Sequence, residues 1–434
     1  MVRLSQCMIV KNEEKNIERA LSWAKGIAFE QIVVDTGSTD KTIERAKRLG
    51  AVIHHFEWIN DFSAAKNFAM DKTTGDWIAI LDADEYMSNE DAKKLISLLE
   101  QIQNDPVLSE ECDAVTCQFI NLDENGNAVS TGTHQRIFRN RSYLRYIGRI
   151  HEAVQVRKKD IKANDIRIFH TGYSKTAQKE TDKNERNILM LRIEHKQNPS
   201  NPDTMHYLAN SLLSLGTDEA RSEAEKLHLT ALNNRRKGNP QVRQLAYDFL
   251  IPRYTNSDLY ADDPGKKDEA ISLCSQAIED APENIDYRYY RAILNNKRGN
   301  HQAALDDLEE CEKELFLAES IPTTRLLTPS PLPLFFQLVI AAEGLGDEDL
   351  IARNSGIITA ILSDEKDQIE IVGPYIRAMS WYGLTDDEVF NRLASIYDLN
   401  DPKDMMLIAK AAKESGAIDF SRVAIELVGK LLNR

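Results

Sequence analysis

The sequence lacks both the cysteine pattern of a disulfide-bonded secreted domain and the long apolar run of a membrane-spanning helix. Its five cysteines form no CxxC pair and no spacing typical of a metal site; they are Cys7, Cys112, Cys117, Cys274 and Cys311. No apolar stretch approaches the roughly 18 residues that cross a bilayer. The first apolar run, residues 4–10, begins too close to Met1 to leave room for a secretory signal. We therefore expect a reduced, cytoplasmic protein without a membrane span.

Positive charge is scarce as well. The chain carries 54 Lys and Arg against 69 Asp and Glu, which gives a formal net charge of -15. General binding to nucleic acid or to anionic membranes depends on a cationic surface, so neither partner is expected, although a local basic groove remains open. The length of 434 residues exceeds what one hydrophobic core usually supports and predicts two or three domains.

The first part of the chain has the pattern of an α/β domain. Through about residue 105, strand-like apolar runs alternate with helix-length amphipathic stretches, which is typical of a mostly parallel sheet covered by helices. The expected strands are 4–10, 31–35, 51–56 and 77–82, and the expected helices are 15–24, 40–49 and 62–72. Shorter alternating runs predict antiparallel strands that complete the domain at 114–122, 133–139, 147–156 and 166–173.

After residue 175 the apolar residues follow a helical period, and two stretches resemble each other. Pro199 leads to Tyr207 and ends at Gly216, while Pro282 leads to Tyr290 and ends at Gly299. The matched separation of Pro and Gly is typical of tetratricopeptide repeats, in which paired helices stack. An irregular helical domain is the alternative.

A proline-rich segment divides the helical part. Residues 321–334 contain four prolines and predict a loop. We therefore expect tetratricopeptide-like repeats over 176–320 and further helical repeats over 321–434, with degenerate units near 338–346 and 393–399.

Two carboxylates follow the fourth expected strand. The apolar run 77–81 leads directly into Asp82, Ala83 and Asp84. On an extended backbone the small Ala83 separates them, so that one carboxylate faces a ligand while the other meets a hard cation bridging phosphate oxygens. Ligands of open sheets bind at the carboxyl ends of the strands, where Asn12 and Asp35 are also expected. This arrangement is what a sugar-nucleotide site needs.

Four motifs in this order closely resemble the family 2 glycosyltransferases of the GT-A fold. They are MIVKNEE at 8–14, VVDTGSTDKT at 33–42, NDFSAAKN at 60–67 and LDADE at 81–85. The resemblance spans residues 1–175, the expected GT-A catalytic domain, and several ordered motifs are far more specific than one. With its helical second part, the chain is most similar to the subgroup with a C-terminal tetratricopeptide-like domain, which includes the sublancin-type peptide S-glycosyltransferases.

The resemblance implies a set of donor-binding residues. The nucleotide sugar would be bound by Val10, Asn12, Glu13, Asp35, Trp58, Lys66, Asp82 and Ala83. Local alternatives stay open, because Asn12 and Glu13 could cap the next helix, Trp58 could pack in the core and Lys66 could be a solvated lysine. The family often has a second acid where this chain has Thr36, which weakens the assignment of Asp35 to uracil.

A divalent cation is also implied, either Mg²⁺ or Mn²⁺. By analogy with the family, Asp84 would bind it directly and His170 would be a second ligand, although His170 could equally be a satisfied core histidine. The cation would neutralise the departing diphosphate, which is the main electrostatic task of the reaction. Arg136, Arg139 and Arg149 could assist by binding the diphosphate.

The family resemblance points to His151 and Glu152 for the catalytic base. We expect both on a strand-like run, where neighbouring side chains face opposite ways and only one meets the acceptor. Glu152 is favoured over His151 as the general base. A buried structural pair is the alternative.

These expectations combine into an inverting transfer from a UDP-sugar to a Cys or Ser side chain of a peptide or protein, for which a repeat groove is suited. A glycan or lipid-linked acceptor of the cell envelope is the second hypothesis. A scaffold with an inactive first domain is the third. The sequence leaves the sugar, the acceptor and the existence of a homodimer open.

Overall fold

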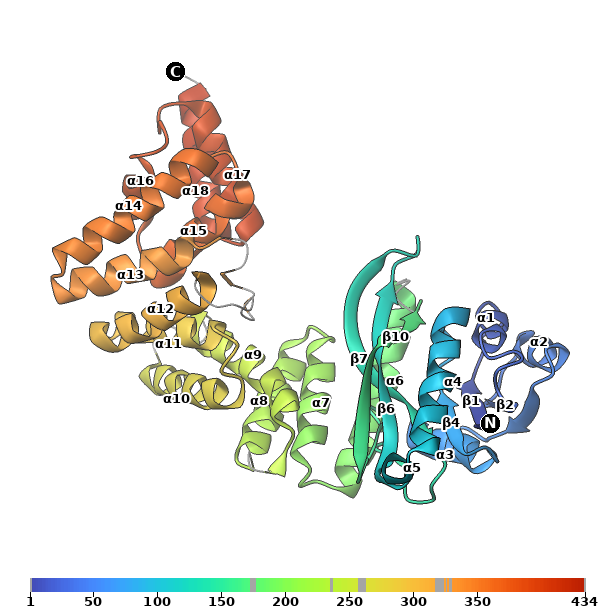
Figure 1. Cartoon of the computed structure of the whole chain (residues 1–434). Helices are drawn as coiled ribbons and strands as arrows, with labels where there is room; N and C mark the ends of the chain where they lie inside the picture. The colour runs from blue at the N-terminus through green and yellow to red at the C-terminus, as the bar shows by residue number, and fades with distance from the viewer. Residues whose placement is uncertain are drawn as a thin grey trace. The chain divides into compact units, whose positions relative to one another are not determined.

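The computed structural model describes residues 2–171, 177–234, 237–256, 263–316, 324, 326–327 and 330–432, with side chains omitted for 177–182 and 256. The chain divides into two compact units (Figure 1). The first contains Met1–Ser200 and Ser211–Gly216, and the second contains Asn201–Asn210 and Thr217–Arg434. The three domains expected from the sequence stay a prediction.

The first half of the α/β unit is the parallel sheet that the sequence predicts. Its strands lie in the order β3-β2-β1-β4 and all pair in parallel. They are β1 (Leu4–Val10), β2 (Glu30–Asp35), β3 (Val52–His55) and β4 (Trp77–Ile80). The connecting helices are α1 (Ile17–Ser22), α2 (Thr42–Arg48) and α3 (Phe62–Asp71). Each bound lies within a few residues of the expected one.

Alternation along the strands explains how the sheet is covered. In β4, Trp77 and Ala79 face an apolar cluster that includes residues of α4 (Asn89–Asn104). Ile78 and Ile80 face a different cluster, which includes residues of α3. A period of two residues directs successive side chains of a strand to opposite faces. Figure 1 shows α4 alongside the strands. Both faces are therefore buried, and the polar ends of the strands are left for a ligand.

The second half of the sheet adds four strands in the order β7-β6-β10-β5. They are β5 (Glu85–Tyr86), β6 (Cys112–Leu122), β7 (Ala128–Arg139) and β10 (Lys159–His170). The antiparallel arrangement expected here is confirmed for the β6/β7 pair but is wrong for β6 and β10, which pair in parallel. The short helix α5 (Pro106–Glu111) precedes β6. The expected end of the last strand, residues 172 and 173, lies outside the described residues.

The strand expected at 147–156 is wrong. Instead, β8 (Tyr146–Ile147) and β9 (Ala153–Val154) form a small antiparallel hairpin. Gly148 and His151, in the intervening loop, have positive φ angles of 89° and 53°. Such a conformation is incompatible with a strand, and for a non-glycine residue such as His151 it requires support from its surroundings.

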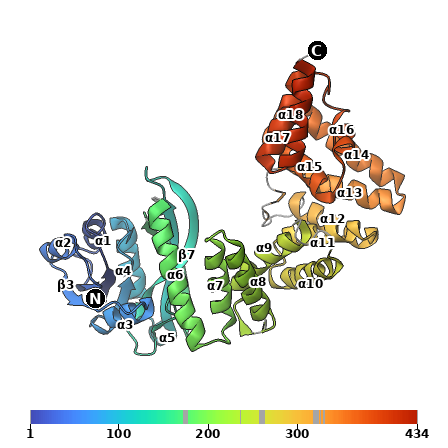
Figure 2. The same ribbon diagram turned by 180° about the vertical axis from the view of Figure 1, so that it is seen from behind.

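The second part of the chain is helical, as expected. Its helices begin with α6 (Ala177–Gln197), of which all residues fall in the first unit, and α7 (Pro202–Leu213). The others are α8 (Asp218–Leu232), α9 (Pro240–Asn256), α10 (Pro264–Asp280), α11 (Asp286–Lys297), α12 (His301–Phe316), α13 (Leu332–Leu345), α14 (Glu348–Glu365), α15 (Ile369–Tyr382), α16 (Asp386–Leu393), α17 (Pro402–Ser415) and α18 (Ile418–Leu432). Figure 2 shows their succession from behind.

Stacked helices share cores in the second unit. One cluster joins α9, α10 and α11, and a larger one runs from Ile285 to Val428. Helices α15 and α17 approach so closely that a Cβ atom on Gly373 would lie 2.8 Å from the carbonyl oxygen of Ala411. Small residues at such crossings are typical of repeat stacking. No helix in the described part of the chain is long and apolar enough to cross a membrane.

Candidate active site

Lys66 forms the centre of a cluster of charged side chains beyond the carboxyl end of β4. Its ammonium lies 3.1 Å from Oδ1 of Asp82 and 2.8 Å from Oε1 of Glu152, and only 4% of its side chain is exposed. Burial alone would lower the pKa of Lys66, but Asp82, Tyr146 and Glu152 raise it above its ordinary value. The lysine therefore stays charged and joins two acids that are 70 residues apart in the sequence.

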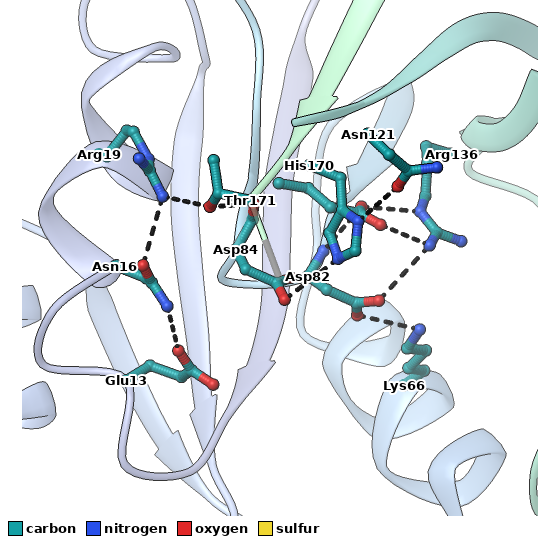
Figure 3. A network of polar contacts seen from close by, with 11 residues as sticks. Glu13, Asn16, Arg19, Lys66, Asp82, Asp84, Asn121, Arg136, His170 and Thr171 are labelled. Atoms are coloured by element: carbon teal, nitrogen blue, oxygen red, sulfur yellow. Dashed lines mark hydrogen bonds and ion pairs between the residues drawn. The ribbon is translucent and has the colours of Figure 1, made fainter. Parts of the chain in front are cut away.

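Arg136 on β7 holds Asp82 from the other side. Its guanidinium donates two hydrogen bonds to Glu85, at 2.8 and 2.7 Å, and one to Asp82 at 3.4 Å. Burial would raise the pKa of Asp82, yet Lys66 and Arg136 lower it, so Asp82 is ionised. Burial also raises the pKa of Glu85, and Arg136 opposes that shift. Figure 3 shows both cations directed at the Asp82 carboxylate.

Asp84 and His170 face each other at the edge of the same cluster (Figure 3). Nε2 of His170 lies 3.3 Å from Oδ2 of Asp84, and Nδ1 lies 2.7 Å from Oδ1 of Asn121. Since an amide oxygen only accepts hydrogen bonds, Nδ1 of His170 carries the proton and donates a hydrogen bond to Asn121. The hydrogen bond to Asp84 raises the pKa of His170 above its ordinary value. Both Asp84 and His170 are partly exposed, which leaves room for a ligand.

The donor atoms of Asp84 and His170 fit a divalent cation. Two neighbouring ligands at about 2.1 Å from an octahedral ion lie about 3 Å apart, close to the separation of these two atoms. Asn121 directs the Nε2 lone pair of a neutral His170 toward the place that such an ion would take. In the described part of the chain, no group of three or more His, Cys, Asp or Glu residues could hold a metal. Further ligands would have to come from a diphosphate or from water.

Backbone contacts place Glu152. The amide of Phe62, at the start of α3, donates to the carbonyl of Arg149, and Oγ of Ser63 donates to the carbonyl of Gly148. Both contacts fix the β8–β9 loop against the helix that carries Lys66. Because residues 148–152 form a loop, the expected strand alternation between His151 and Glu152 is wrong. Glu152 points to Lys66, whereas His151 is exposed.

The Asp82–Asp84 segment also differs from the expectation. Strand β4 ends at Ile80, and the following residues form a turn in which the amide of Glu85 donates to the carbonyl of Asp82. The two acids are therefore separated by a turn and not by strand alternation. Asp82 points to the Lys66–Arg136 side and Asp84 to His170. Ala83 between them is buried.

The other expected donor residues lie at the carboxyl ends of β1 and β2. Val10 pairs with Asp35, whose Oδ1 accepts from the amide of Ser38 and whose Oδ2 lies 3.4 Å from His55. The side-chain oxygen of Asn12 accepts from the amide of Thr39, so it holds the adjacent loop.

Glu13 is connected to the backbone of Asp84 by a series of hydrogen bonds. It accepts from Asn16, Arg19 donates to Asn16 and to Thr171, and Thr171 donates to the backbone carbonyl of Asp84 (Figure 3). Trp58 is only partly buried and hydrogen-bonds to Asn60, and the structure gives it no bond to the charged cluster.

Of the three arginines suggested for the diphosphate, Arg136 alone joins the charged cluster. Arg139 stacks over Trp77 and donates to the carbonyl of Ser109, and Arg149 binds Gln197 and the carbonyl of Asn60.

A protein-family model matches the stretch of the chain that contains most of these residues. The model described as Glycosyl transferase family 2 matches residues 5–110. This stretch belongs to glycosyl transferase family 2. The matched stretch contains Asn12, Asp35, Lys66, Asp82 and Asp84. Glu152 and His170 lie beyond it.

Two relatives are similar to this chain over a longer stretch than the family model. Glycosyltransferase SunS of Bacillus subtilis is 28% identical over 294 residues, which cover 66% of this chain and 65% of SunS. A TPR repeat-containing protein of Synechococcus elongatus is 37% identical over 154 residues, 36% of either chain. This chain therefore matches less than two thirds of the length of each. A solved structure of TarS from S. aureus in complex with UDP-GlcNAc aligns over 70% of this chain and 89% of its own, with 14% identity and a TM-score of 0.32.

Sequence reasoning missed Asn121 and Glu85, and did not foresee that Lys66 joins Asp82 to Glu152. Glu85 is the last residue of the LDADE motif, which was a usable signal. Asn121 lies at the end of β6 in a stretch without a motif, and only the parallel pairing of β6 with β10 brings it opposite His170. No sequence signal could have revealed that pairing.

Proposed function

We propose that this chain is an inverting, metal-dependent glycosyltransferase that moves a sugar from a UDP-sugar to a Cys or Ser side chain of a peptide or protein. The observation that supports it most is the gathering of Asp82, Asp84 and Glu152 around Lys66 and His170 at the carboxyl end of β4. Ligands of open α/β sheets bind at this edge. The family 2 match over residues 5–110 supports the reaction class.

The cation is the first part of the proposal. Asp84 and His170 would hold Mg²⁺ or Mn²⁺, with Asn121 fixing the tautomer of His170. When bound, such an ion neutralises the charge that the departing diphosphate acquires. Asp82, which already has two cationic partners, is assigned to the ribose or to a water of the cation.

Glu152 is the proposed general base. Its carboxylate would take the proton of the acceptor thiol or hydroxyl as the acceptor atom bonds to the anomeric carbon and the bond from that carbon to the diphosphate oxygen breaks. The UDP leaves with the bonding electron pair, and attack from the opposite face inverts the configuration. Lys66 orients the Glu152 carboxylate, at 2.8 Å.

The acceptor is proposed from the helical unit, since stacked repeats commonly bind peptides. The net charge of -15 fits an enzyme with no nucleic-acid partner, and the cysteine pattern fits a cytoplasmic one. A glycan or lipid-linked acceptor is the rival within enzymes, and an inactive scaffold is the rival outside them.

The deciding experiment offers a panel of UDP- and GDP-sugars with Mn²⁺ and measures nucleotide release and product mass. We expect UDP release that Asp84→Ala abolishes and that Asp165→Ala, an exposed carboxylate on the same strand as His170, preserves. No release with any donor would favour the scaffold. Transfer to a glycan with none to peptides would favour the envelope hypothesis.

A further inference from the structure

One edge of β7 has no strand beside it where the candidate site begins. Strand β7 pairs with β6 over nearly its whole length, but with β4 only through Ile137, Phe138 and Arg139. From Ala128 to Arg136, no strand in the described parts of the chain pairs with the edge opposite β6. The seven residues 128–134 are all exposed, whichever face they point to.

The middle of this edge lacks most of the features by which proteins usually block strand addition. Residues 128–134 read Ala-Val-Ser-Thr-Gly-Thr-His, without proline, lysine, arginine or acidic residues. Exposed edges are commonly protected by charge, proline, bulges or a covering element. The β6–β7 ladder skips two residues of β7, Arg136 between the pairs of Val115 and Thr116 and Val129 between the pairs of Asn121 and Leu122, whereas residues 130–135 pair in regular register. A regular, uncharged edge of several residues is therefore available.

The free edge is continuous with the charged cluster. Strand β4 ends at Ile80, just beyond its last pairing with β7, and the chain then turns into Asp82 and Asp84. Arg136, the inner end of the free edge, bonds to Asp82. Farther along, Ser130 accepts a hydrogen bond of 2.8 Å from Asn121, whose oxygen binds His170. A chain added to this edge would therefore run toward the proposed cation and base.

Backbone chemistry decides what such an edge binds. Alternate residues of an edge strand direct their N–H and C=O groups away from the paired neighbour. These groups recognise another extended polypeptide, largely independently of its sequence, and the small Ser, Thr and Gly side chains would leave its backbone accessible. Glycans and lipids lack the alternating donors and acceptors.

We infer that an extended acceptor polypeptide adds as a strand to the β7 edge, residues 130–135, and thereby presents its Cys or Ser to Glu152. This inference rests on the proposed function and names how its acceptor is held. An added strand pairs one residue with each residue of the edge, so the regular stretch 130–135 accommodates about six residues of acceptor on one side of the modified residue. The helical unit is free to bind other parts of the same polypeptide.

The test uses the full chain with a library of unstructured 15-residue peptides, each with one Cys or Ser. UDP release without peptide reports on the proposed function. The best acceptor from the library then undergoes an N-methyl scan, which removes one backbone N–H at a time. Strand addition predicts that transfer falls at least tenfold at every second residue and little at the residues between. Equal sensitivity at all residues, or none, would overturn the inference.

Cross-linking locates the peptide independently of turnover. A benzophenone amino acid in place of Thr131 should cross-link to the peptide, whereas the same group in place of Lys93, which is exposed on α4, should not. Thr131→Pro should raise the KM for the peptide at least tenfold, with the thermal melting of the variant as the check on folding. Cross-links to a second copy of the chain, or no peptide transfer despite UDP release, would contradict strand addition. Failure of UDP release would contradict the proposed function instead.

Discussion

At the scale of single residues, Lys66 determines the geometry of the candidate site. A lysine with 4% of its side chain exposed is retained only with compensating charge, and Asp82 and Glu152 supply it. Tyr146 adds its ring, whose centroid lies 5.4 Å from the ammonium. The lysine thus acts as the link between the acidic motif and the loop that carries the proposed base.

Replacing Lys66 by methionine tests this role. Lys66→Met leaves two acids without their shared cation, and we expect a loss of about 3 kcal/mol in the free energy of unfolding, the lower end for a broken buried pair because Asp82 is partly exposed. Donor hydrolysis should fall with it. Urea denaturation of the full chain measures the change, and Lys93→Met, exposed on α4, is the control. Equal stability of the two variants would argue against a structural link.

Asn121 allows a second residue-scale prediction. Because it fixes the orientation of His170, Asn121→Ala should weaken Mn²⁺ binding about 10- to 100-fold. Electron paramagnetic resonance of free Mn²⁺, titrated with protein in the presence of UDP, measures the affinity directly. Asn125→Ala, in the exposed β6–β7 turn, should bind as the unchanged protein does. An unaltered affinity for Asn121→Ala would remove Asn121 from the metal site.

At the scale of secondary-structure elements, a buried histidine pair joins α7 and α8. Nδ1 of His206 lies 3.0 Å from Nδ1 of His228, so one ring donates and the other accepts, which requires that they are not both protonated. Both Nε2 atoms are buried, and neither has a hydrogen-bond partner among the described residues. Burial, with Arg243 acting on His206, lowers the pKa of His206 to about 4, and burial lowers that of His228 to about 3.

This pair predicts how stability depends on pH. In the unfolded chain these histidines are protonated near pH 6.5, whereas in the folded protein they stay neutral down to about pH 4. The unfolded state therefore binds more protons in this window, and the stability falls as the pH drops through it. Each histidine contributes up to about 1.4 kcal/mol per pH unit. Urea denaturation from pH 7.5 to 4.5 should show the slope, and the double variant His206→Leu, His228→Leu should flatten it. Identical slopes would exclude the pair as the cause.

At the scale of the whole molecule, the two compact units have separate cores. The clusters that contain β1 to β10 share no residue with the cluster from Ile285 to Val428. A substitution that destabilises the helical core should therefore affect only the helices that share this core.

Phe336 tests this separation. It is fully buried in α13, and Phe336→Ala should cost about 3–5 kcal/mol. Hydrogen exchange measured by mass spectrometry should rise together over α11 to α18, because these helices share one core, and should be unchanged in the strands of the sheet. Phe316→Ala, which removes an exposed ring from α12, is the control. Faster exchange in the sheet strands of Phe336→Ala would show that the units are coupled.

The sequence by itself determined the local elements and the class of site. Apolar runs that alternate with helix-length stretches predicted β1 to β4, the match of Pro and Gly spacing predicted helical repeats, and the motif around Asp82 and Asp84 predicted acids at a strand end. These features depend on residues near one another in the chain, where propensity and periodicity act.

Only the tertiary structure decided how distant segments meet. It placed Lys66 between Asp82 and Glu152, paired β6 in parallel with β10 so that Asn121 meets His170, and turned an expected strand into the β8–β9 loop. The free β7 edge also follows from β4 ending before β7 does. Pairing between strands far apart in sequence is set by packing of the whole sheet, which no local pattern encodes.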